Sequence, residues 1–153
     1  MFAIRCMARA TLLAAAALTV APGRSAELDP KAITVTLPDN IPWRKGPGQD
    51  SALIQGDPSK PGVYIQLLRW HAGNNSRPHF HSTDRFIYVL SGTWYMGSGP
   101  KYDPASMQPI PAGSYVIHHA GGIHYDGAKE GQGDCVLYIV GTGPMTTTQA
   151  EQK

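Results

Sequence analysis

The sequence predicts an all-β domain, either a sandwich or a barrel, and three observations support this. Short runs rich in Val, Ile, Tyr and Thr recur along the chain, and Gly, Pro, Asn, Asp or Ser residues separate them. Turn formers are abundant, with 17 Gly and 13 Pro among 153 residues. No segment beyond the first 26 residues shows helical periodicity. The length and the 42% hydrophobic content support one compact domain rather than two.

The strands are predicted in chain order from these runs and the turns that bound them. Residues 38–46 are expected to form turns, with Trp43 covering one end of the core, and residues 101–108 are expected to form a loop. The domain is predicted to span 27–145, and the polar segment 146–153 is expected to be a flexible C-terminal tail. The predicted strands are 33–37, 63–70, 79–90 (one strand or a pair), 93–96, 114–119, 123–126 and 135–140.

The N-terminal segment has the pattern of a signal peptide. Arg5 and Arg9 give it a positive start, residues 10–20 are apolar, and Pro22 and Gly23 end the run. The apolar run is about half as long as a membrane-spanning helix. We therefore expect residues 1–26 to be removed on export, which leaves a periplasmic or secreted protein without a membrane span. The alternative is that the segment forms a helix of the mature protein.

Export predicts a mature chain that begins near Ser25 to Glu27 and lies outside the cytoplasm. Mass spectrometry of the periplasmic or secreted fraction checks this expectation. Recovery of an intact chain from Met1 to Lys153 in that fraction would contradict it.

Charge and cysteine content exclude some partners and cross-links. The formal net charge is +2 and the 13 Lys and Arg are scattered, so we expect no nucleic-acid partner. Cys6 lies in the predicted signal peptide, which leaves Cys135 without an internal disulfide partner. Cys135 is predicted to be a small buried hydrophobic residue, because it begins an apolar run.

The histidines indicate a metal site. All six lie between His71 and His124. His79 and His81 are two residues apart, so on a strand their side chains point to the same face. Neutral imidazole is the commonest protein ligand for several transition metals. A third ligand would have to come from another strand.

Two segments resemble the paired motifs of the cupin superfamily. The first, GNNSRPHFHSTDRFIYVLSG, has Gly73, His79, His81 and Gly92 at the motif positions. The second, GSYVIHHAGGIH, has the motif residues Gly113, Gly121 and His124. The resemblance implies a double-stranded β-helix (a jelly-roll barrel) as the fold. It also implies one divalent metal ion, Fe, Mn, Ni or Zn, on His79, His81 and His124.

Three positions depart from the cupin pattern. Arg85 replaces the Glu that is the fourth ligand in many cupins, and Arg does not ligate metals because it stays protonated. His119 replaces a Pro, and Ala128 stands where the motif often ends in Asn. The sequence therefore resembles the three-histidine cupins, which include thiol dioxygenases and a β-diketone-cleaving dioxygenase.

Arg85 and His118 are the candidate catalytic residues. Strand alternation places Arg85 on the same face as His81, where a buried guanidinium requires an anion. That anion is either a fixed carboxylate, such as Asp126 or Asp134, or a carboxylate or enolate of a substrate. His118 and His119 point to opposite faces of a strand, and either could be a fourth ligand or an acid–base group. His71 is expected to have a structural or a surface role.

Two functions remain open at this point. The first is a metal-dependent enzyme, an oxygenase or an isomerase or decarboxylase, acting on a small chelating and possibly anionic substrate. The alternative is a non-catalytic metal-binding or ligand-binding sensor module, because one fold hosts many functions. A small molecule is the expected partner in both, and a homodimer is also open. A storage protein is disfavoured by the intact histidine set.

Overall fold

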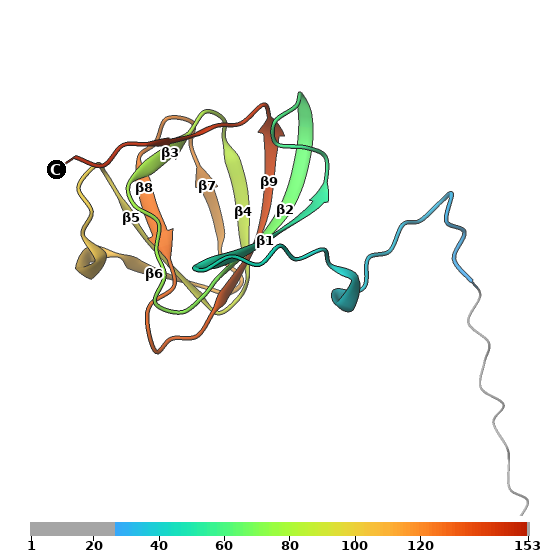
Figure 1. The fold of residues 1–153 in the computed structure, drawn as a ribbon, viewed down its shortest axis with the longest axis horizontal. Helices are drawn as coiled ribbons and strands as arrows, with labels where there is room; N and C mark the ends of the chain where they lie inside the picture. The colour runs from blue at the N-terminus through green and yellow to red at the C-terminus, as the bar shows by residue number, and fades with distance from the viewer. Residues whose placement is uncertain (1–26, 153) are drawn as a thin grey trace, which may run out of the picture. The chain divides into compact units, whose positions relative to one another are not determined.

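Two five-stranded antiparallel sheets face each other and form a barrel, which confirms the predicted double-stranded β-helix (Figure 1). The computed structural model describes residues 27–152, so the predicted signal peptide lies outside the described residues. Two short 3-10 helices, η1 (Pro38–Asn40) and η2 (Pro104–Ser106), accompany the strands. One sheet has the order β1 (Gln49–Gln55), β2 (Gly62–Trp70), β9 (Cys135–Gly143), β4 (Arg85–Ser91) and β7 (Tyr115–His118). The other has the order β10 (Thr147–Gln149), β3 (His79–His81), β8 (His124–Gly127), β5 (Thr93–Ser98) and β6 (Gln108–Pro111).

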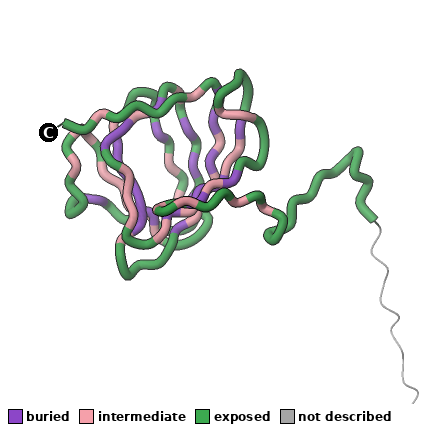
Figure 2. Tube along the Cα trace, viewed as in Figure 1, coloured by how far each residue is buried: buried purple, intermediate pink, exposed green. Residues whose placement is uncertain are grey.

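The core fills one part of the space between the sheets. Alternation along β4 and β9 turns every second side chain inward, and Ile87 pairs with Ile139 across these strands. Figure 2 shows buried residues along the strands and mainly exposed residues in the connecting loops. Cys135 belongs to this core, and burial raises the pKa of its thiol to about 12. Its side chain therefore packs as a hydrophobic group, as the sequence predicts.

The predicted strand at 33–37 is absent, and this prediction was wrong. Ile33, Val35 and Leu37 alternate as strand residues do, yet their exposed fractions are 50, 56 and 59%. An alternating pattern becomes a strand only when a neighbouring strand accepts its hydrogen bonds. Within residues 27–152, no helix has the length and apolar character of a membrane span.

The structure also contains three strands that the sequence analysis did not predict. β1 and β6 carry Gln, Asp or Pro residues that weaken the strand signal. β10 lies inside the segment expected to be a flexible tail, where Thr147 to Gln149 pair with His81 to His79. The tail residues therefore complete the sheet next to the histidine strand.

The glycines of the two cupin-like motifs serve the chain reversals between strands. Gly73, Gly92, Gly113 and Gly121 all have positive φ, which side chains with a Cβ rarely adopt. At Gly92, between β4 and β5, a Cβ would also lie 2.3 Å from the Asp134 carbonyl oxygen. The motif glycines thus allow the turns that place the histidine strands.

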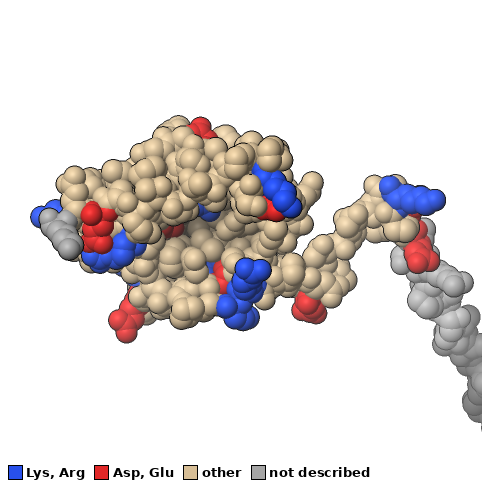
Figure 3. All heavy atoms as spheres, turned by 45° about the horizontal axis from the view of Figure 1, so that its top comes forward, with Lys and Arg blue, Asp and Glu red and all other residues tan. Residues whose placement is uncertain are grey.

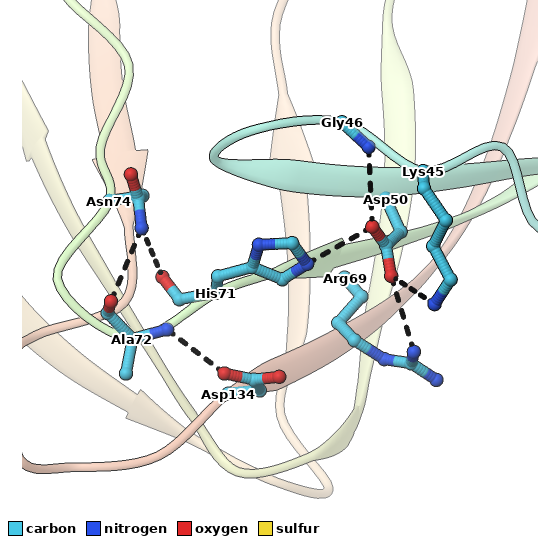
Figure 4. Close-up of polar contacts among 8 residues, drawn as sticks. All are labelled: Lys45, Gly46, Asp50, Arg69, His71, Ala72, Asn74 and Asp134. Atoms are coloured by element: carbon cyan, nitrogen blue, oxygen red, sulfur yellow. Dashed lines mark hydrogen bonds and ion pairs between the residues drawn. The ribbon is translucent and has the colours of Figure 1, made fainter.

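A buried carboxylate fastens the start of β1 to the end of β2 (Figure 4). Asp50 has a side-chain exposure of only 2%. It accepts hydrogen bonds from Lys45 Nζ at 2.8 Å and Arg69 Nη1 at 3.3 Å, and it lies 3.0 Å from His71 Nε2. The hydrogen bond from Lys45 is the main cause of the lowered pKa of Asp50. His71 is therefore a structural residue, as expected.

We expect this network to make the barrel acid-sensitive. Because the pKa of Asp50 is lower in the folded state, its contribution is present above the unfolded carboxyl pKa, 3.8, and is lost as the pH falls through the folded value. Urea unfolding between neutral and acid pH measures this loss. Asp50→Asn should show a shallower loss of stability below the unfolded pKa than the wild type, and equal slopes would contradict the assignment.

Candidate metal centre

The histidine cluster is assembled by the pairing of β3 with β8. His79 and His81 are the first and third residues of β3, and both are buried. His124 begins β8 and pairs directly with His79 across the two strands. One ring nitrogen of each histidine lies within 4.8 Å of the others, close enough for one ion.

The hydrogen bonds of the three rings indicate which ring nitrogen carries the lone pair. Nδ1 of His79 donates to the Arg77 carbonyl oxygen at 2.8 Å, and Nδ1 of His124 donates to that of Gly122 at 2.9 Å. Nδ1 of His81 lies 3.0 Å from Thr147 Oγ1. With Nδ1 protonated in each ring, Nε2 carries the lone pair in all three. Acceptors of this kind commonly orient metal-binding histidines.

Burial keeps His81 and His124 neutral, which metal binding by imidazole requires. Desolvation is the largest cause of the lowered pKa of His81, about 3, and the positive charge of Arg85 lowers it further. Desolvation likewise lowers the pKa of His124. At neutral pH these two rings therefore offer lone pairs without losing a proton first. The residues present thus fit a transition-metal ion.

Arg85 points into the barrel from the first position of β4, as strand alternation predicts. It is 8% exposed, and its Nη1 lies 2.6 Å from His81 Nε2, to which it donates a hydrogen bond. Within the described part of the chain it forms no ion pair, and its Nε has no hydrogen-bond partner. The suggested structural ion pair with Asp126 or Asp134 is therefore not formed.

The Asp126 carboxylate accepts hydrogen bonds from residues other than Arg85. Its carboxylate accepts hydrogen bonds from Trp94 Nε1 at 2.9 Å, Trp70 Nε1 at 3.2 Å and Ser76 Oγ at 2.7 Å. It lies two residues after His124 on β8, so both side chains face the barrel interior. The sequence analysis considered Asp126 only as a partner of Arg85, although this spacing already placed it on the inner face.

His118 lies beside the cluster, whereas His119 does not. The His118 ring centroid is 3.7 Å from that of His124, and neither ring nitrogen has a hydrogen-bond partner among residues 27–152. Burial lowers the pKa of His118 to about 2, so the ring is neutral. The side chain of His119 is 76% exposed and lies 3.9 Å from Asp84. Of the two adjacent histidines, His118 is therefore the one that lies in the site.

A cavity of about 280 Å³ gives access to this group of residues. His79, His81, Arg85 and His118 line it, together with Asp126. Figure 3 shows a face of the molecule with few charged side chains and a hollow near its middle. The remaining lining combines polar residues of β1, β2 and β10 with apolar residues of the core. A ligand in this cavity would therefore contact the histidines and Arg85 together.

Comparisons with known proteins agree with this fold. The polyketide cyclase RemF from Streptomyces resistomycificus superposes with a TM-score of 0.65 at 16% identity, covering 79% of this chain and 87% of RemF. A double-stranded β-helix protein from Klebsiella pneumoniae gives 0.58 at 16% identity, covering 77% and 97%. KdgF from Halomonas sp. gives 0.55 at 16% identity, covering 72% and 95%. These identities support the fold alone.

Sequence comparison identifies the family. A search of curated proteins finds no match. The model of the ChrR Cupin-like domain matches residues 31–146, which include both histidine motifs and nine of the ten strands in full. The chain therefore belongs to the ChrR cupin-like family of the cupin superfamily.

Proposed function

We propose that this protein is a metal-dependent enzyme that acts on a small, chelating, anionic substrate. Nε2 of His79, His81 and His124 would hold one divalent ion, and the substrate would bind in the adjoining cavity. The observation that carries the proposal is a buried guanidinium without an ion-pair partner beside three histidines that all carry the lone pair on Nε2. The polyketide cyclase RemF is an example of an enzyme with this fold.

Three protein ligands leave coordination positions for a substrate. A divalent metal in this site would supply Lewis acidity, or electron transfer to dioxygen if the metal is redox-active. Substrates with two neighbouring oxygen donors, such as dicarbonyls, enols or hydroxyketones, suit such a site. An oxygenase is the class we favour, with isomerisation or decarboxylation as the related outcomes.

Arg85 and His118 would orient the substrate through hydrogen bonds. The guanidinium presents a planar pair of donors that matches a carboxylate or an enolate, and burial strengthens this contact. One ring nitrogen of neutral His118 can accept a hydrogen bond from a substrate hydroxyl, and the other can donate one to a substrate oxygen. Both side chains are buried in the barrel, which strengthens their polar contacts with a substrate.

Metal analysis followed by an activity screen tests the proposal. Protein purified from its native compartment, which we propose is the periplasm or the exterior, should contain one Fe, Mn, Ni or Zn ion per chain. Oxygen uptake should then be measured with enolisable dicarbonyls and phenolic ketones, and product analysis should follow any isomerisation or decarboxylation. A Zn ion held by four protein groups, with no turnover, would instead support the sensor function.

His118→Asn is expected to separate chemistry from metal binding. The substitution should leave the metal content unchanged, because His118 is outside the three-histidine group. Loss of a positioned hydrogen-bonding group should lower kcat by about 10²–10³-fold. The measurement is metal content and kcat on the same preparation, with His119→Asn as the exposed control. Unchanged kcat would remove His118 from the mechanism.

A further inference from the structure

We infer that Arg85 couples metal binding to anion binding, so that each ligand raises the affinity of the site for the other. The inference rests on the proposed metal site and concerns its regulation. Arg85 Nη1 donates a hydrogen bond to His81 Nε2, and this nitrogen is the atom that would bind a metal ion. The guanidinium is therefore a competitor of the metal while the anion site is empty.

The surroundings of Arg85 explain why this contact forms. The guanidinium is buried, no carboxylate among residues 27–152 pairs with it, and its Nε lacks a hydrogen-bond partner. A buried cation in this state donates to an available lone pair, and here it donates to that of His81 Nε2. Arg85 also lines the cavity of about 280 Å³, which has room for a small anion.

Metal binding alone carries two costs at this site. The ion must break the hydrogen bond from Arg85 to His81, and it must then lie beside the positive charge of Arg85. The lost hydrogen bond involves a charged donor, so its removal should change the metal affinity by about tenfold to a hundredfold. Both costs arise because position 85 holds an arginine, where many cupins have a carboxylate ligand.

An anion in the cavity removes both costs. A carboxylate offers the guanidinium two oxygen acceptors in place of one imidazole nitrogen, and its charge compensates that of Arg85. His81 Nε2 then becomes free for the metal. Thermodynamic linkage requires the reverse effect as well, so bound metal should tighten anion binding by the same factor. The site would thus be filled by metal and anion together in preference to either alone.

Calorimetric titration of the metal-free full chain with Zn²⁺ tests the coupling. Titrations in sodium acetate and in sodium perchlorate at equal ionic strength isolate the effect of a carboxylate. We expect acetate to raise the Zn²⁺ affinity of the wild type by about tenfold or more. Acetate also binds Zn²⁺ weakly in solution, which would lower the apparent affinity, so an increase is diagnostic. Equal or lower affinity in acetate would overturn the inference.

Two arginine variants provide the matched comparison. Arg85→Met removes the donor and the charge while keeping a long side chain, and should bind Zn²⁺ about tenfold more tightly than the wild type, with no response to acetate. Arg44→Met changes an exposed arginine outside the metal site, and should behave as the wild type. Arg85→Met with wild-type Zn²⁺ affinity, or with a full acetate response, would contradict the coupling.

The histidine variants separate failure of this inference from failure of the metal site. If His79→Ala/His81→Ala abolishes Zn²⁺ binding while Arg85→Met leaves it unchanged, the metal site stands and the coupling is wrong. If the histidine replacements do not alter Zn²⁺ binding, both the proposed function and the coupling fail.

Discussion

Asp126→Ala should lower the free energy of unfolding by about 3–5 kcal/mol, because it leaves several buried hydrogen-bond donors without an acceptor. The indole N–H groups of Trp70 and Trp94 and the hydroxyl of Ser76 all donate to this carboxylate. Each buried donor left without an acceptor costs about 1–3 kcal/mol, and a small cavity adds to the loss. Urea unfolding of metal-free protein measures the effect without interference from the ion.

Two further variants make the Asp126 result specific. Asp126→Asn keeps one carbonyl oxygen as an acceptor for the indoles, so its loss should be smaller than that of Asp126→Ala. Glu130→Ala removes an exposed carboxylate nearby in the sequence and should change stability by less than about 0.5 kcal/mol. An Asp126→Ala protein with wild-type stability would show that the carboxylate does not organise this end of the cavity.

His79→Ala/His81→Ala should lower metal affinity by about 10³-fold or more, because it removes two of three ligands. The expected result is loss of most metal from the purified protein and loss of the stabilisation that metal gives to thermal unfolding. The metal-free forms should differ less, since the histidines belong to the cavity and not to the main hydrophobic cluster.

Histidines elsewhere in the barrel supply the controls for this double variant. His119→Ala changes an exposed histidine and should retain the wild-type metal content. His71→Ala removes a neighbour of Asp50 and should lower stability with no change in metal stoichiometry. Equal metal loss in all three proteins would indicate nonspecific binding to histidine and would contradict the site.

The fold could be predicted where the sequence pattern coincides with burial. Residues 63–70 and 135–140 are rich in β-branched or apolar residues, and they became β2 and β9 in the middle of one sheet. Strand prediction failed at the edges of the sheets. The alternating run at 33–37 has no partner strand, whereas Thr147 to Gln149 form a strand without hydrophobic alternation because β3 pairs with them. Pairing of this kind is a long-range property that local pattern does not contain.

The site could be predicted as a set of residues but not as a set of contacts. The two-residue spacing of His79 and His81 and the motif position of His124 indicated the group that the structure brings together. Strand alternation also placed Arg85 inside. The partners of Arg85 and Asp126 depend on which strands lie opposite, so the indole donors to Asp126 and the contact with His81 required the structure.

X-ray absorption spectroscopy of the metal in the purified full chain tests the central claim most directly. The account predicts one ion per chain with three imidazole nitrogens at about 2.0–2.2 Å and the remaining positions filled by water or another small ligand. The imidazole signal should vanish in His79→Ala/His81→Ala and persist in His119→Ala. A metal-free wild type, or an ion whose shell is unchanged by loss of His79 and His81, would contradict it.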